Sequence, residues 1–102
     1  MNEHDKQIRT KINDAIDLMY NKMALLPYTD YYVDFGSYRV KIFILKLNIF
    51  GRIKYHAILY ESYSEPPWDT AHTIVHQTYD KKYLLRKIMM AIKNQEIAIA
   101  LT

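Results

Sequence analysis

The chain has 102 residues, which is the size of one small domain, and it contains no cysteine. The lack of cysteine excludes disulfide bonds, thiolate nucleophiles and cysteine-ligated zinc, and it suits a reducing cytoplasm. The formal net charge is only +3, and no apolar stretch approaches the roughly 20 residues of a membrane-spanning helix, so we expect a soluble, cytoplasmic protein without a membrane partner.

Residues 3–26 have the pattern of an amphipathic helix, in which apolar side chains recur at spacings of three and four. Pro27 ends this helix, because a proline disfavours helical backbone in the residue before it. Residues 30–36 then read as a short strand that Gly36 closes.

Residues 38–61 predict the strongest pair of strands, with Phe50 and Gly51 as a tight turn. The alternation of apolar side chains changes phase after Ile44, so we predict a β-bulge near Ile44 and Leu45. In residues 52–61 one face is apolar and the other is basic and aromatic. The apolar face holds Ile53, Tyr55, Ala57 and Leu59.

The last third of the chain predicts a loop, a strand and a second helix. Residues 62–70 form the loop, and residues 71–78 are sufficiently rich in β-branched side chains for a fourth strand. Asp80, or alternatively Thr78, caps a helix that runs to about Asn94. The buried stripe of this helix would be Leu84, Leu85, Ile88, Met89 and Ile92. In the tail (96–102), large apolar residues alternate with alanine. The tail either extends this helix or forms a short fifth strand, and we favour a helix that ends before the tail.

These elements predict a single α+β domain over residues 1–102. It would contain an N-terminal helix, a three- to four-stranded antiparallel meander and a C-terminal helix, arranged in two layers. With three strands and with Lys81 and Lys82 opening the last helix, residues 4–94 resemble the double-stranded-RNA-binding domain in the order of their elements. That resemblance implies RNA binding, and a fourth strand at residues 71–78 would break its topology.

Charge is segregated along the sequence. Residues 35–60 and residues 81–95 each contain five basic residues and no acidic residue. Such segregation creates local potentials, and aromatic side chains beside the cations could stack on unpaired bases. We therefore predict a surface for a nucleic acid or an acidic partner. It would comprise Arg39, Lys41, Phe43, Arg52, Lys54, His56, Tyr60, Lys81, Lys82, Arg86, Lys87 and Lys93, with Tyr38 as a further ring. The alternative is that these residues are the solvated outer face of a sheet and a helix.

Other chemistry has weaker signals. Tyr63, Trp68 and Asp69 form an aromatic and acidic group beside two prolines, which predicts a protein-binding anchor, unless Trp68 covers the core. His72 and His76 could chelate zinc with Asp69 if they were helical, but in a strand they would stand about 13 Å apart. The β-branched residues between them favour the strand, so we predict neither a metal nor a cofactor.

The function that we expect is non-enzymatic binding, without catalytic residues. The chain is rich in residues with AT-rich codons. In size and composition it resembles the small proteins of phages and mobile elements, of which anti-CRISPR proteins are the best-known group. That resemblance implies a stoichiometric inhibitor or modulator that docks on a host protein or nucleoprotein complex. Direct binding of RNA or DNA is the main alternative, a small basic ribonuclease using His56 is another, and a homodimer through the tail stays open.

Overall fold

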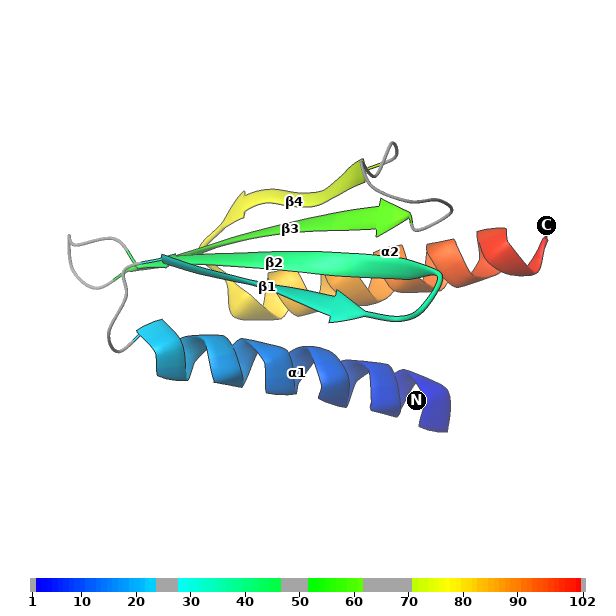
Figure 1. Ribbon diagram of the computed structural model, residues 1–102, viewed down its shortest axis with the longest axis horizontal. Coiled ribbons are helices and arrows are strands. Elements are labelled where there is room, and N and C mark those ends of the chain that lie inside the picture. The colour runs from blue at the N-terminus through cyan, green and yellow to red at the C-terminus, as the bar shows by residue number, and fades with distance from the viewer. Residues whose placement is uncertain (1, 24–27, 47–51, 62–70, 102) are drawn as a thin grey trace.

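The computed structural model describes residues 2–23, 28–46, 52–61 and 71–101, and confirms the predicted two-layer α+β fold. Four strands form one antiparallel sheet in the order β1-β2-β3-β4. Both helices lie on one side of the sheet (Figure 1), where α1 contacts β1 and β2, and α2 contacts β3 and β4. The elements are α1 (Glu3–Met23), β1 (Tyr28–Asp34), β2 (Tyr38–Lys46), β3 (Ile53–Glu61), β4 (Ala71–Thr78) and α2 (Lys81–Ala100).

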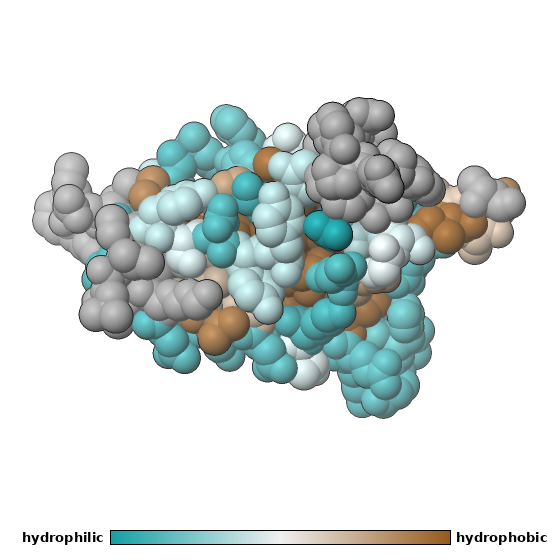
Figure 2. Space-filling view, in the orientation of Figure 1, coloured by the Kyte–Doolittle hydropathy of each residue, from teal (hydrophilic) through white to brown (hydrophobic). Residues whose placement is uncertain are grey.

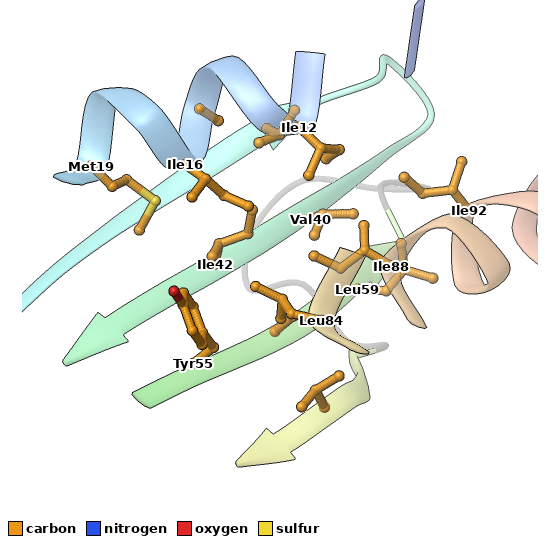
Figure 3. Packing of buried hydrophobic residues seen from close by; sticks show 14 of the residues in the cluster. Ile12, Ile16, Met19, Val40, Ile42, Tyr55, Leu59, Leu84, Ile88 and Ile92 are labelled. Carbon is orange, nitrogen blue, oxygen red and sulfur yellow. The ribbon is translucent and has the colours of Figure 1, made fainter. Parts of the chain in front are cut away.

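One hydrophobic core joins both helices to a single face of the sheet. Ile12 and Ile16 of α1 and Ile88 of α2 are completely or almost completely buried, as are Val40 and Ile42 of β2. Figure 3 shows these side chains gathered between the helices and the strands. Neither α1 nor α2 therefore lies on the opposite face of the sheet.

Local chemistry explains where the helices begin. The side chain of Asn2 accepts a hydrogen bond from the backbone N–H of Asp5 at 2.8 Å, in the first turn of α1. Asp80 is the N-cap of α2, where its carboxylate accepts from the N–H groups of Lys82 and Tyr83 at 2.9 and 3.3 Å. Of the two predicted caps, Asp80 is therefore the one that the structure uses.

The turn between β1 and β2 depends on Gly36, which has a φ of 88°, a conformation that side-chain-bearing residues rarely adopt. The N–H of Gly36 donates to the Asp34 carboxylate at 2.8 Å, which fixes the turn. Because the turn begins here, β1 ends at Asp34 and not at Gly36 as predicted. The strand also begins at Tyr28, two residues before the predicted start.

The predicted β-bulge in β2 is wrong. β2 pairs with both β1 and β3 through Ile44 and Leu45 without a shift in register. Leu45 shares the face opposite the helices with Phe43, so its apolar side chain needs no exchange of faces. The register shifts instead between β3 and β4, near Ala57 and Ile58. Residues 47–51, which include the predicted turn and the later part of the phase change, lie outside the described residues, as do residues 24–27 at the predicted end of the first helix.

For the tail, the favoured prediction of a helix that ends before it is wrong, and the alternative of an extended helix is confirmed, because α2 continues to Ala100 and residues 96–100 form no strand. The segment 95–100 consists of residues that a helix accepts, without glycine or proline. Ile97 and Leu101 are exposed, at 50% and 83%, and the space-filling view shows hydrophobic surface where the last turns of α2 project beyond the sheet (Figures 1 and 2). The tail therefore offers no edge strand for a homodimer.

The fourth strand is present, so the chain departs from the three-stranded order of the double-stranded-RNA-binding domain. Within the part of the chain that the structure describes, no helix is long and apolar enough to cross a membrane.

Candidate functional site

The face of the sheet opposite the helices, here called the outer face, presents side chains from all four strands. Side chains alternate between the faces along each strand, and residues paired across an antiparallel ladder share a face. The core face of β2 begins at Tyr38, which is 3% exposed, so Tyr38 is a core residue and not a ring of the outer face as predicted. By register and ring contacts, the outer face contains Tyr28, Asp30, Tyr32, Asp34, Arg39, Lys41, Phe43, Leu45, Lys54, His56, Ile58, Tyr60 and His76.

Four rings form a continuous row across the outer face, one from each strand. The ring centroids of Tyr28 and Phe43 are 6.0 Å apart, those of Phe43 and His56 are 5.2 Å apart, and those of His56 and His76 are 5.7 Å apart. His56 Nδ1 lies 2.5 Å from the carbonyl oxygen of His76. Because a carbonyl oxygen only accepts, this nitrogen carries a hydrogen, and the bond ties the ring of His56 to β4.

A second aromatic group surrounds Lys41 beside this row. The rings of Tyr32 and Tyr60 are 6.0 Å apart, and the Lys41 ammonium lies 5.1 Å from the centroid of Tyr32 and 4.5 Å from that of Phe43. These distances permit cation–π attraction. Burial lowers the pKa of Lys41, but interactions with the Tyr32 hydroxyl and the Asp30 carboxylate outweigh it, so that the pKa lies above its ordinary value.

The two central cations of the outer face are paired with carboxylates of β1. The ammonium of Lys41 lies 3.5 Å from the carboxylate of Asp30, and the guanidinium of Arg39 lies 3.8 Å from that of Asp34. β2 belongs to the basic segment 35–60, which contains no acidic residue, yet β1 places an acid beside each of these two cations. The charge segregation along the chain is therefore partly cancelled in space.

The basic residues of α2 do not share a surface with the outer face, because α2 packs on the opposite side of the sheet. Lys81 lies over the ring of Tyr20, while Arg86 and Lys87 lie over that of Tyr83. Among the described residues, none of the basic side chains of α2 forms an ion pair. Lys82 is exposed, as is Lys93, which lines a groove between the two helices. The predicted basic surface is thus two separate surfaces.

The remaining predicted residues have different positions. Lys54, His56 and Tyr60 lie on the outer face, whereas Arg52, just before β3, has its guanidinium 5.0 Å from the ring of Tyr79. Tyr63, Trp68 and Asp69, the predicted protein-binding anchor, lie outside the described residues.

His72 and His76 are in a strand, as the β-branched residues between them predicted. No group of three side chains able to ligate a metal occurs within residues 2–23, 28–46, 52–61 and 71–101.

Sequence reasoning missed several residues of the outer face, namely Tyr28, Asp30, Tyr32, Asp34 and His76. The spacing of two between the first four could have placed them on one face, although the predicted strand began at residue 30 and so did not include Tyr28. Their position opposite the basic strand required the β1–β2 register, and the contact between His76 and His56 required the irregular β3–β4 register.

No protein-family model, curated protein or solved structure matches this chain.

Proposed function

We propose that this is a non-enzymatic binding protein that docks a partner protein on its outer face. The observation that carries the proposal is the row of rings from Tyr28 to His76, which crosses all four strands. Aromatic side chains supply much of the affinity at protein interfaces. Here they stand on a sheet, so they are positioned before the partner arrives and little conformational entropy is lost on docking.

The pairing of charge on the outer face supports a protein partner over a nucleic acid. A phosphate backbone would have to compete with Asp30 for Lys41 and with Asp34 for Arg39. A protein partner can present both signs of charge and preserve or extend these pairs. The mixture of tyrosines with paired charges is thus better suited to a protein surface.

The basic side of α2 supports a finer proposal about the partner. A protein docked on the outer face leaves Lys82, Arg86 and Lys93 on the opposite side of the molecule, where they can approach a nucleic acid held by the same complex. The partner would then be a host machine that processes nucleic acid, and the protein would be its stoichiometric inhibitor or modulator, in the manner of anti-CRISPR proteins.

Affinity capture from the native host tests the docking face. The tagged wild type is compared with Tyr32→Ala/Tyr60→Ala on the outer face and with Tyr83→Ala on α2 as a control for loss of a tyrosine. We expect one protein to be retained by the wild type and by Tyr83→Ala, to resist nuclease treatment, and to be lost with the double variant in its folded state. Retention by the folded double variant, or release by nuclease alone, would refute the proposal.

Direct binding of RNA or DNA is the second candidate, and the cations of α2 favour it because none of them is neutralised by a described carboxylate. Fluorescence anisotropy with single- and double-stranded RNA and DNA, at about 50 and 200 mM salt, tests it. Binding through 6–10 phosphates would weaken by about 10³–10⁵ between these conditions. Lys82→Glu/Lys87→Glu should abolish such binding, while Lys41→Glu/Lys54→Glu should preserve most of it.

A further inference from the structure

A cleft of about 320 Å³ opens on the outer face, next to the row of rings. Tyr28, Phe43, His56 and His76 line it, and Leu45 adds aliphatic surface. Pockets that bind small ligands begin at roughly this volume. The cleft therefore has room for one ring-sized group of a larger partner.

The polar atoms of the cleft favour an anion beside that ring. Lys54 and Gln77 are among the described lining residues, and none of the described lining residues carries a carboxylate. The nearby carboxylate of Asp30 is engaged by Lys41 and by the Tyr28 hydroxyl. Within the described part of the chain, Lys54 forms no ion pair, so no described carboxylate competes with a ligand for its ammonium.

We infer that the cleft receives a single aromatic side chain of the partner protein and that Lys54 pairs with a carboxylate beside it. This inference rests on the proposed docking function and specifies its anchor. The partner's ring would replace solvent against Phe43 and His56, and the pairing with Lys54 would select acidic segments. The occupant is thus an aromatic residue in an acidic stretch of a protein.

Amide chemical shifts of the ¹⁵N-labelled protein test this inference with three probes. N-acetyl-L-tryptophan carries an indole and a carboxylate, N-acetyl-L-tryptophanamide carries the indole alone, and uridine 5′-monophosphate carries a base and a phosphate. We expect the first probe to shift the amides of Phe43, His56 and His76, and to bind about 2- to 5-fold more tightly than the amide, the range of an exposed ion pair. The nucleotide should bind more weakly than N-acetyl-L-tryptophan.

Two matched variants show whether Lys54 is responsible for the preference. Lys54→Met should remove the difference between the two tryptophan probes, and Lys46→Met should preserve it, because Lys46 follows the core-face alternation of β2. No shift at the three amides at the highest soluble probe concentration would overturn the inference. Tighter binding of the nucleotide, or an unchanged preference in Lys54→Met, would also overturn it. If one of these results is obtained while affinity capture of the partner still depends on Tyr32 and Tyr60, the cleft does not receive an aromatic side chain, but the proposed docking function is retained.

Discussion

The ammonium of Lys41 lies 3.5 Å from the carboxylate of Asp30, on the face of the sheet opposite α1 and α2. Asp30 belongs to β1 and Lys41 to β2, and the β1–β2 register brings the two strands together. The pair lies beside the rings of Tyr32 and Phe43. In the sequence Lys41 looks available to phosphate, but in the fold it lies among aromatic rings and beside a carboxylate. This arrangement favours a protein partner over a nucleic acid.

The first prediction concerns this pair. In the wild type, the pKa of Lys41 lies above its ordinary value, partly because of Asp30. Since the pKa of the folded state is raised, the stabilisation is present below the unfolded pKa of about 10.5 and is lost as the pH rises through the folded value. Asp30→Asn should lower the pKa of Lys41, measured by NMR titration of the lysine side chain. Asp34→Asn serves as the control and should change it less; an equal pKa in the wild type and Asp30→Asn would contradict the assignment.

The second prediction concerns alkaline pH and Tyr38. Its buried hydroxyl donates to Glu96 at 3.1 Å, and burial, followed by the charge of Glu96, raises the pKa of Tyr38 above the ordinary value of 10.0. The neutral phenol is favoured in the folded state, so stability is lost as the pH rises from about 10 towards the folded pKa. Tyr38→Phe should be about 1 kcal/mol less stable at neutral pH because a hydrogen bond is lost, but its stability should fall less between pH 10 and 12.

Absorbance titration of the phenols and chemical unfolding at each pH would measure both effects of Tyr38→Phe. Tyr83→Phe, on an exposed part of α2, is the control that removes a phenol without touching Glu96. If Tyr38→Phe loses stability above pH 10 as steeply as the wild type does, the assignment to Tyr38 is incorrect.

The third prediction compares the two faces of the sheet with one residue type. Ile42 is completely buried on the core face, while Ile58 is partly buried on the outer face. Ile42→Ala should lower the free energy of unfolding by about 2–5 kcal/mol, and Ile58→Ala should lower it by clearly less, as measured by urea unfolding. Equal losses would mean that the outer face is covered as a second core and is not a docking surface.

The fourth prediction concerns the start of α2. The carboxylate of Asp80 accepts from the N–H groups of Lys82 and Tyr83. Asp80→Ala should destabilise the protein by about 1 kcal/mol, and Asp80→Asn should retain most of the stability, because asparagine caps helices nearly as well. Thermal or urea unfolding of the three proteins measures both values. A loss in Asp80→Asn as large as in Asp80→Ala would show that the charge is essential, and not the capping geometry.

Local patterns were sufficient to predict most of the fold. The alternation in residues 53–60 placed Tyr55, Ala57 and Leu59 in the core and His56 on the other face, because side chains in a strand alternate strictly. The spacing of Leu84, Ile88 and Ile92 predicted the buried stripe of α2, and Asp80 predicted its start. The extension of α2 through its last turns was only one of the alternatives, because alternation of isoleucine with alanine is compatible with either a helix or a strand in a short segment.

The candidate site was harder to predict because it depends on contacts between strands. Phe43 and His56 could be assigned to the outer face from the sequence, but their neighbours Tyr28 and His76 come from β1 and β4. The neutralisation of Lys41 by Asp30 likewise requires the β1–β2 register. Charge counted along a strand therefore overestimates the potential of a sheet face when the adjacent strand supplies the opposite charge.

Photo-crosslinking tests the central claim, docking of a protein on the outer face, most directly. A photoreactive benzoylphenylalanine replaces Tyr60 on the outer face in one protein and Tyr83 on α2 in another, and both are irradiated in cells that naturally contain the chain. The account predicts a discrete adduct from position 60 that protease digests and nuclease does not, with no such adduct from position 83. A nuclease-sensitive adduct at position 60, or a protein adduct formed only from position 83, would contradict it.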